Sequence, residues 1–216
     1  MLFRSETDAY AASSFERAVA ARERLAEEIV AVAVPQRKGD PVTVAHDEQP
    51  GKGDPSKLAS LRPAFSKEGV TTAGNASSIN DGACALVVST RAEGALARLR
   101  GYVQVAQDPK HFTTAPAAAI QKLLAAHGLK VEDVELFEVN EAFSVVAMHA
   151  ARACGIPRER MNVNGGAVSL GHPIGMTGAR LVLTAAMELK RRGGRYAVAT
   201  PCIGGGEATA VLIERS

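Results

Sequence analysis

The sequence has 216 residues, of which 46% are hydrophobic and 22% are charged, and this balance is ordinary for a folded globular protein. Its formal net charge of +2 is too small to indicate a nucleic-acid partner. No apolar run reaches the length of a membrane span and no charged-then-apolar leader opens the sequence, so we expect a soluble, cytoplasmic protein without a membrane partner. Three cysteines are too few for a disulfide framework, which agrees with a reducing compartment.

The first part of the sequence predicts a helix, a hairpin and a long loop. A helical apolar pattern runs through residues 6–29, and short strand-like runs follow at 31–34 and 42–45. Residues 46–63 are rich in glycine, proline and charge and are expected to form a loop. Leu-Phe-Arg-Ser at positions 2–5 matches the translation of a common sequencing adapter, so we expect about the first five residues to be foreign to the protein.

The remainder predicts alternating strands and helices. A buried strand at 83–90 and a short helix at 91–99 come first. Further strands are predicted at 100–107, 134–139, 195–201 and 207–213, and further helices at 115–127, at 141–154 and up to residue 192. This alternation is typical of a layered α/β fold in which helices cover a sheet. Right-handed crossovers should bring the strand ends and their loops to one side.

Residues 162–180 (NVNGGAVSLGHPIGMTGAR) form the most informative stretch. They hold five glycines and one histidine, and they lead directly into an apolar helical run. A glycine-rich loop that enters a helix aims unpaired N–H groups and a positive dipole end at whatever lies in front. Taken alone, the stretch could be a tight turn with a core histidine. Two further polar clusters, at 140–143 (NEAF) and 202–206 (CIGGG), follow predicted strands and favour a functional site.

In order and spacing these three motifs resemble the C-terminal signatures of the thiolases, most nearly the acetoacetyl-CoA type. The resemblance begins near Glu6, reaches the C-terminus, and covers only the second half of a thiolase. It implies a thiolase-like layered fold with a C-terminal αβαβα domain at residues 95–216. Residues 1–61 would then belong to a loop domain that covers coenzyme A, and residues 62–94 would hold the last strand of a truncated N-terminal domain.

The residue types in the motifs suit thioester chemistry, in which negative charge develops on a carbonyl oxygen and fixed donors stabilise it. His172 can supply one donor through its ring, and Asn140 can hold a water that supplies another. The backbone N–H of Gly204 can line a second oxyanion hole. Cys202, beside a glycine turn, is the candidate general base and acid, with an expected depressed pKa, and the matching cysteine of the family has that role. A small buried hydrophobic residue is the alternative interpretation of Cys202.

By the same resemblance the loop at 46–63 covers coenzyme A, which would be bound as a substrate rather than as a tight cofactor. Lysine suits such a ligand because its ammonium group pairs with phosphate as a point charge. The residues expected to contact coenzyme A are Lys52, Asp54, Lys57 and Ser77, with Phe143 and Met176 in the pocket wall near the acyl group. Core packing explains the last two almost as well. No metal-ligand spacing is present in the sequence.

The implied activity is that of an acetyl-CoA C-acetyltransferase, which joins two acetyl-CoA into acetoacetyl-CoA and CoA, or cleaves that product, through an acyl-cysteine intermediate. The nucleophilic cysteine belongs to the missing half, because Cys84 is expected in a core strand and Cys154 at a helix end. We therefore expect the chain alone to be inactive and the completed protein to be a homo-oligomer. The alternatives are a 3-oxoacyl-CoA thiolase of fatty-acid β-oxidation and a non-catalytic CoA-binding fragment.

Some relatives bind potassium through backbone carbonyls and a tyrosine hydroxyl. The carbonyl positions match Ala73, Gly74, Ala76 and Val168, whereas the tyrosine position matches Phe15, which has no side-chain oxygen. Losing one oxygen ligand weakens a site for a hard cation. We therefore expect little or no activation by potassium.

Overall fold

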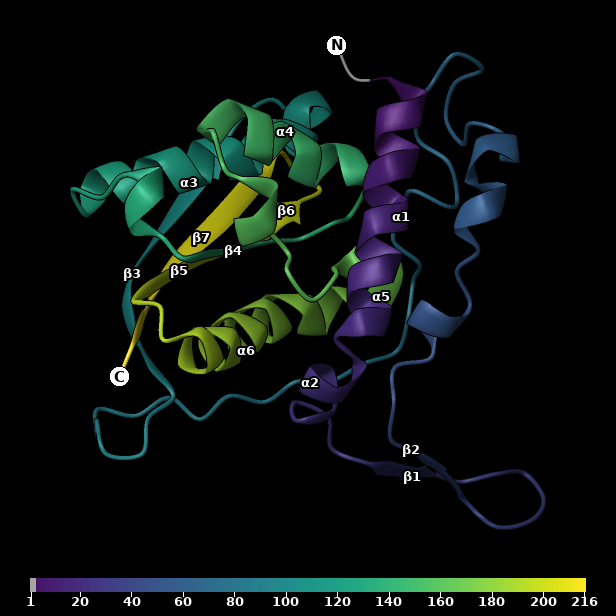
Figure 1. The fold of residues 1–216 in the computed structure, drawn as a ribbon, viewed down its shortest axis with the longest axis horizontal. Coiled ribbons are helices and arrows are strands. Elements are labelled where there is room, and N and C mark those ends of the chain that lie inside the picture. Colours follow the sequence, from purple (N-terminus) through teal and green to yellow (C-terminus); the bar gives the residue numbers. More distant parts are fainter. Residues whose placement is uncertain (1–2) are drawn as a thin grey trace.

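The computed structural model describes residues 3–216 and has a mixed α/β architecture (Figure 1). The helices are α1 (Arg4–Ala20), α2 (Arg22–Ala26), α3 (Ala115–Ala126), α4 (Ser144–Cys154), α5 (Ala167–Leu170) and α6 (Ile174–Arg192). The strands are β1 (Val32–Val34), β2 (Val42–Val44), β3 (Ala97–Ala106), β4 (Leu136–Val139), β5 (Tyr196–Thr200), β6 (Cys202–Ile203) and β7 (Glu207–Arg215). The α/β class predicted from the sequence is confirmed.

The main sheet has the strand order β3-β7-β5-β4, with β6 paired to β7. Strands β4 and β5 are parallel, with Val139 opposite Thr200, whereas β7 runs antiparallel to both β3 and β5. The carboxyl ends of parallel strands meet at one edge of a sheet. The segments that follow β4 and β5 therefore start side by side, as the sequence predicted for the NEAF and CIGGG motifs.

Both faces of this sheet are covered by helices (Figure 1). Successive residues of a strand point to opposite faces. Phe137 and Val198 pack into the core beneath α3 and α4, whereas their neighbours Leu136 and Ala197 pack against α6. All four side chains are at most 2% exposed. The result is a three-layer arrangement in which the sheet lies between α3 and α4 on one side and α6 on the other.

Helix α1 lies along this layered unit and packs against α4 and α5 (Figure 1). Its residue Tyr10 is 6% exposed and belongs to the main core. The hairpin of β1 and β2, with Val32 opposite Val44, projects from the rest of the molecule and confirms the two strands predicted there. Near the start of α1, Arg4 donates hydrogen bonds to the carbonyl groups of Leu58 and Leu61. Met1 and Leu2 lie outside the described residues, and the foreign origin of the first residues stays a prediction.

Two predicted helices have different bounds in the structure. The helix predicted over 6–29 is divided into α1 and α2, because the backbone leaves the helical region at Ala21, where φ is −93° and ψ is 5°. The helix predicted from residue 141 begins only at Ser144. Phe143 is extended, with φ −141° and ψ 152°, and the N–H of Ser144 donates to the carbonyl group of Asn75.

The strand predicted at 83–90 and the helix predicted at 91–99 are wrong. Residues 83–90 pair with no other strand within the described part of the chain, and Val87 and Val88 are 99% and 76% exposed. Cys84, expected in a core, is only partly buried. Apolar β-branched residues favour a strand, but a strand also needs a neighbour for its N–H and C=O groups. Strand β3 already starts at Ala97, within the stretch predicted as a helix.

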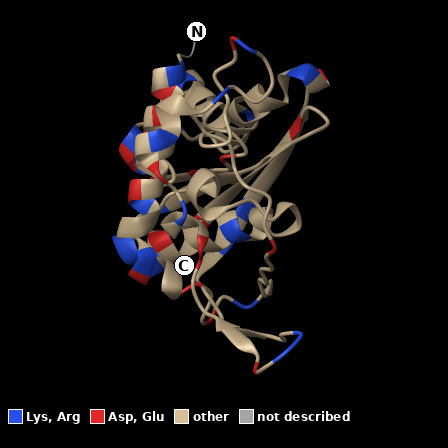
Figure 2. Cartoon of the chain, turned by 90° about the vertical axis from the view of Figure 1, so that its right-hand side faces the viewer, with Lys and Arg blue, Asp and Glu red and all other residues tan. Residues whose placement is uncertain are grey.

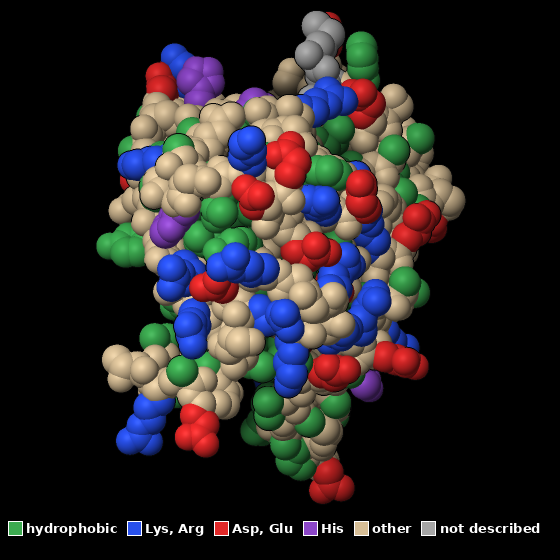
Figure 3. Space-filling model, turned by 60° about the vertical axis from the view of Figure 1, so that its left-hand side comes forward, with side chains coloured by type: hydrophobic (Ala, Val, Ile, Leu, Met, Phe, Trp, Pro, Cys, Tyr) green, Lys and Arg blue, Asp and Glu red, His purple; other side chains and the backbone are tan. Residues whose placement is uncertain are grey.

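No helix within residues 3–216 combines the length and the apolar character that crossing a membrane requires. Acidic and basic residues are interspersed along the helices and near the tip of the β1–β2 hairpin (Figure 2). They are also interspersed over the face shown in Figure 3, so the charge on that face is mixed in sign. Among the ion pairs of the chain, Arg191 pairs with Glu27 and Arg195 pairs with Glu214.

Candidate functional site

Asn140 and His172 come together where strands β4 and β5 end. Asn140 follows β4, and its N–H donates a 2.9 Å hydrogen bond to the carbonyl group of Thr200, the last residue of β5. His172 directly precedes Pro173, the N-terminal cap of α6. The side-chain Nδ2 of Asn140 lies 3.3 Å from Nε2 of His172. The structure therefore joins two of the residues that the sequence predicted for the site.

The surroundings of this pair favour a neutral imidazole and a polar ligand. Burial lowers the pKa of His172, and the positive charge of Arg180 lowers it further. Asn140 is fully buried, and its Oδ1 has no hydrogen-bond partner among the described residues. A buried acceptor without a partner is costly in a folded protein, so a polar atom of a water or ligand is expected there.

The segment at residues 71–81, rich in small and polar residues, passes directly beside His172. The carbonyl group of Ser78 accepts a 2.9 Å hydrogen bond from the N–H of His172. Gly171 has a φ of 91°, and a Cβ atom there would lie 2.2 Å from the side chain of Asn80. Position 171 therefore requires glycine, both because of its positive φ and because no Cβ atom fits there. Ser77 is oriented differently, because its hydroxyl and its N–H both donate to the carbonyl group of Ala142 at 3.0 Å.

Glu141 is a buried carboxylate at the centre of a hydrogen-bond network that the sequence did not reveal. Its oxygens accept hydrogen bonds from Tyr10 Oη at 2.8 Å, Ser14 Oγ at 2.7 Å and Asn162 Nδ2 at 2.8 Å. The N–H of Val168 donates a fourth, at 3.2 Å. The network therefore links α1 to the loop that leads to His172. Its one sequence signal is an acidic residue directly after a buried strand and beside the candidate Asn140.

The glycine pair of the loop allows this carboxylate to fit. A Cβ atom at Gly166 would lie 2.3 Å from the carboxyl carbon of Glu141. No side chain can occupy that space without moving the carboxylate or the backbone. At Gly165, φ is 81° and a Cβ atom would lie 2.8 Å from the carbonyl oxygen of Ser14. The glycine density read from the sequence therefore serves close contact with α1.

Cys202 begins β6, two residues beyond the end of β5, and is partly buried. Burial raises the pKa of its thiol to about 11. The depressed pKa expected from the sequence is therefore wrong for this chain. A thiol pKa falls when a cation lies nearby, and no positive charge within the described residues acts on this thiol. Gly204 lies in the following turn, where a Cβ atom would meet nothing within 4 Å, so its surroundings are open.

Phe143 and Met176, expected in the pocket wall, lie in different surroundings. The ring of Phe143 packs edge-on against Phe65 and Phe112, with centroid distances of 5.7 and 6.3 Å. Phe65 is 77% exposed, so this aromatic group borders solvent. Met176 lies in the first turn of α6, and a Cβ atom at Gly82 would lie 3.0 Å from its Cε. Each side chain therefore borders a different part of the 65–82 segment.

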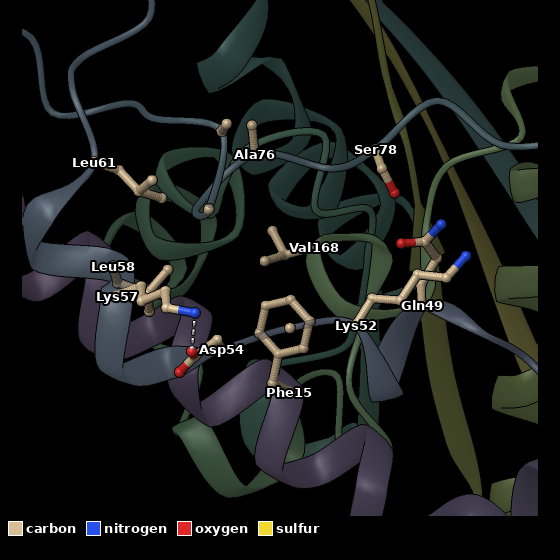
Figure 4. Close-up of a pocket in the computed structure, with 13 residues that line it drawn as sticks. Phe15, Gln49, Lys52, Asp54, Lys57, Leu58, Leu61, Ala76, Ser78 and Val168 are labelled. Carbon is tan, nitrogen blue, oxygen red and sulfur yellow. Dashed lines mark ion pairs between the residues drawn. The ribbon is translucent and has the colours of Figure 1, made fainter.

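A cavity of ≈ 290 Å³ opens beside α1 (Figure 4). Three of the residues predicted to contact coenzyme A, Lys52, Asp54 and Lys57, are part of its lining. Lys57 pairs with Asp54 at 2.9 Å, and Lys52 pairs with Glu48 at 2.7 Å. These ion pairs are largely exposed, and exposed pairs are weak. Both ammonium groups can therefore exchange their partners for an anionic ligand.

Phe15 also lines this cavity, and its ring points into it (Figure 4). It shares the cavity with Ala73, Gly74, Ala76 and Val168. A Cβ atom at Gly53 would lie 2.1 Å from the ring, so the ring packs directly against the 46–63 loop. The positions that match the potassium site of some relatives are thus brought together, but a phenyl ring supplies no oxygen. The described residues contain no group of His, Cys, Asp and Glu suited to a metal ion.

A buried hydrogen bond between Arg180 and Glu138 connects the two elements next to Asn140 and His172. Nη1 of Arg180 on α6 lies 3.1 Å from Oε2 of Glu138 on β4. Glu138 is 2% exposed, and burial raises its pKa to about 8, although Arg180 acts in the opposite direction. Glu28 and Asp47 also have raised pKa values because of burial, and Arg180 opposes both shifts.

The fold and the site together define a class of protein. A histidine and an asparagine lie at the carboxyl edge of a layered α/β sheet, and an open glycine turn follows β6. Such groups can stabilise a carbonyl oxyanion in acyl transfer. Two family models match the sequence: the thiolase N-terminal domain over residues 2–92 and the thiolase C-terminal domain over residues 93–215. The chain belongs to the thiolase family.

Individual relatives agree with this assignment. Acetyl-CoA acetyltransferase 2 of Arabidopsis thaliana is 49% identical over 98% of this chain and 55% of its own length. The crystal structure of the Bacillus anthracis acetyl-CoA acetyltransferase matches with a TM-score of 0.92 and 38% identity, over all of this chain and 57% of that one. Human mitochondrial 3-ketoacyl-CoA thiolase in complex with CoA matches with a TM-score of 0.88 and 36% identity, over all of this chain and 55% of that one. The chain spans about half the length of the relatives it matches.

Proposed function

We propose that this chain is the second half of an acetyl-CoA C-acetyltransferase, which condenses two acetyl-CoA into acetoacetyl-CoA and CoA, or cleaves that product. One observation carries the proposal: Asn140 Nδ2 lies 3.3 Å from His172 Nε2, and the buried Oδ1 of the same asparagine has no partner among the described residues. This pair offers donors and a water position where a thioester oxyanion would form. The acetyl-CoA acetyltransferases among the relatives support the same activity.

In this proposal His172 stabilises the oxyanion and activates a thiol, and Asn140 holds the water that supplies the second donor. The backbone N–H of Gly204 lines the other oxyanion hole, which receives the acyl carbonyl. The nucleophilic cysteine lies in the half that this chain does not span. Cys154 is a poor candidate because it ends α4, where its thiol lies 3.5 Å from the carbonyl oxygen of Ala117. Cys84 lies in a segment that pairs with no strand among the described residues.

Cys202 is the proposed acid and base of the Claisen condensation. It removes a proton from the methyl group of acetyl-CoA, the carbanion attacks the acyl-cysteine carbonyl, and the departing cysteine thiolate regains a proton. With a pKa of about 11 the thiol is protonated in this chain at neutral pH. Its role as a base therefore requires a neighbouring group that lowers the pKa, and we place that group in the other half of the protein.

Coenzyme A is proposed to enter as a substrate along the cavity beside α1. Lys52 and Lys57 would pair with its phosphate groups, with Asp54 orienting Lys57 through their ion pair. Ser77, which is partly buried, would contact the pantetheine arm. Phe143 and Met176 would border the acyl end. The human mitochondrial 3-ketoacyl-CoA thiolase was crystallised with CoA, which supports this ligand class.

A second candidate is a thiolase for longer 3-oxoacyl-CoA substrates in fatty-acid metabolism. It is favoured by the similarity to the human mitochondrial 3-ketoacyl-CoA thiolase, whose TM-score of 0.88 is close to that of the acetyl-CoA acetyltransferase structure. Exposed Phe65 beside Phe143 would offer apolar surface to a longer acyl chain. We also propose that the completed protein is a cytoplasmic homo-oligomer without nucleic-acid or membrane partners.

The test is a fusion of this chain to the N-terminal half of the Arabidopsis relative, assayed for cleavage of acetoacetyl-CoA in the presence of CoA. We expect turnover that His172→Ala removes and that the exposed control His111→Ala retains. The chain without the fusion should be inactive.

Three outcomes would overturn the proposal. Full activity in the His172→Ala fusion would remove the histidine from the chemistry. Tight CoA binding without turnover, in a fusion whose parent relative is active, would favour a non-catalytic CoA-binding fragment. Faster cleavage of long 3-oxoacyl-CoA than of acetoacetyl-CoA would favour the second candidate.

A further inference from the structure

Thr177 is a buried hydroxyl residue that touches the ring of His172 from the opposite side to Asn140. Its side chain is in the first turn of α6 and is 2% exposed. Thr177 Oγ1 lies 2.7 Å from Nδ1 of His172 and 2.9 Å from the carbonyl oxygen of Pro173. Both distances are those of good hydrogen bonds.

The protons of this arrangement can be counted. The Pro173 carbonyl oxygen, which also accepts from the N–H groups of Met176 and Thr177, can only accept, so its contact with Thr177 is a hydrogen bond when the hydroxyl donates its single proton there. The hydroxyl oxygen must then accept from Nδ1 of His172, which therefore carries a proton. A neutral imidazole has one N–H, so its Nε2 carries the lone pair. The amide Nδ2 of Asn140 faces that lone pair at 3.3 Å and can donate to it.

We propose that Thr177 is a positioning residue that fixes His172 in the Nδ1–H tautomer, with the lone pair of Nε2 directed toward Asn140. The tautomer is argued from the hydrogen bonds of His172, whereas its use in catalysis rests on the proposed function. In this tautomer Nε2 accepts the proton of a thiol, which leaves a thiolate and an imidazolium, and the new Nε2–H can then donate to the oxyanion. In the other tautomer Nε2 would already carry its proton and could not activate a thiol.

The opposite arrangement requires more changes. Turning the amide of Asn140 would direct its Oδ1 toward Nε2, which would then need the proton. Nδ1 would become an acceptor, and the Thr177 hydroxyl would have to leave the carbonyl group of Pro173 to donate to it. The neutral state itself is supported by burial, which lowers the pKa of His172, with Arg180 as the charged group that acts in the same direction.

The test is long-range ¹H–¹⁵N NMR of the 216-residue chain with ¹⁵N-labelled histidine, because protonated and unprotonated ring nitrogens have very different chemical shifts. The chain has five histidines, and His172→Gln identifies the signals of interest. We expect His172 to show an Nδ1–H and an unprotonated Nε2. Thr177→Ser keeps the hydroxyl and should keep this pattern. Thr177→Val should shift His172 to the Nε2–H form or to a mixture.

Thr184→Val is the matched control, because Thr184 is equally buried on the same helix but bonds Glu28. Thr184→Val should leave the His172 pattern unchanged. If a buried threonine-to-valine change acted by loosening α6 in general, both variants would alter the pattern. An Nε2–H pattern in the unmodified chain would overturn the inference, as would an unchanged Nδ1–H pattern in Thr177→Val. Should Thr177→Val not fold, Thr177→Ala removes the same hydroxyl without the added branch. An inactive fusion with the Nδ1–H pattern intact would count against the proposed function alone.

Discussion

Ser14 of α1 donates a 2.7 Å hydrogen bond to Glu141, 127 residues further along the chain. The same hydroxyl lies 3.0 Å from Oγ of Ser169, which belongs to α5 between Gly166 and His172. Both serines and Glu141 are fully buried. The first helix of the chain thus holds the strand end that carries Asn140 and the loop that carries His172.

We predict that Glu141→Gln destabilises the chain by about 2–4 kcal/mol. The buried carboxylate accepts four hydrogen bonds, whereas the amide NH₂ of glutamine can only donate and would face groups that are donors themselves. Urea unfolding followed by circular dichroism measures the change. Glu16→Gln, on the exposed side of α1, is the control and should be nearly neutral. Equal stability of the two variants would mean that the network contributes nothing.

Gly166→Ala should also destabilise the chain, by about 1–3 kcal/mol, because its Cβ would overlap the Glu141 carboxyl group. Gly166 has extended backbone angles, with φ −151° and ψ −164°, so the cost comes from the contact alone. Gly178→Ala is the matched control, since a Cβ there meets nothing within 4 Å and alanine favours a helix by up to about 1 kcal/mol. Thermal unfolding of both variants should show shifts of opposite sign. A Gly166→Ala variant as stable as the parent would contradict the close packing described.

Glu138 should make the stability of the chain fall as pH rises. Burial raises its folded-state pKa to about 8, above its ordinary value of 4.5. Between these values the folded state holds a proton that the unfolded state releases, so the free energy of unfolding decreases with pH, by at most ~1.4 kcal/mol per pH unit. Glu28, Glu141, Glu188 and Arg180 are the charged groups that act on it.

The measurement for Glu138 is the difference between the parent chain and Glu138→Gln in urea unfolding at several pH values from 5 to 9. The parent should lose more stability than the variant across this range. Parallel pH profiles would show that Glu138 does not take up a proton on folding.

Potassium should activate the completed protein little or not at all. Phe15 supplies no oxygen to the cavity that it shares with Ala76 and Val168, and the remaining backbone carbonyls hold a hard cation less well. Turnover in potassium and in sodium at matched ionic strength should be equal, and Phe15→Tyr, which adds a hydroxyl, should introduce a difference. A severalfold, potassium-specific rise in the unmodified protein would contradict this reading of Phe15.

The sequence predicted most of the layered unit because the apolar pattern of each element is complete within its own length. Helices α3 and α6 and strands β4, β5 and β7 carry apolar residues at the spacing of their own structure, so local pattern suffices. Residues 83–90 have equally apolar composition, but strand formation depends on a neighbour, and no described segment pairs with them. Composition alone cannot supply that neighbour.

The sequence predicted the site residues that stand in short motifs. It did not predict properties that depend on residues far away in the sequence. Asn140 and His172 stand in such motifs and meet in the structure. Two partners of Glu141, Tyr10 and Ser14, lie more than 120 residues away on α1, so no local pattern could reveal them. The pKa of Cys202 was mispredicted because a nearby glycine turn says nothing about burial, which dominates the shift.

We propose that Cys202 moves the proton alpha to the thioester while His172 stabilises the oxyanion. Exchange of the acetyl-CoA methyl protons with deuterium tests these two roles most directly. In the fusion with an N-terminal half, Cys202→Ala should abolish this exchange while acyl transfer to the nucleophile survives in part. His172→Ala should damage both steps. Normal proton exchange and condensation in Cys202→Ala would contradict the account.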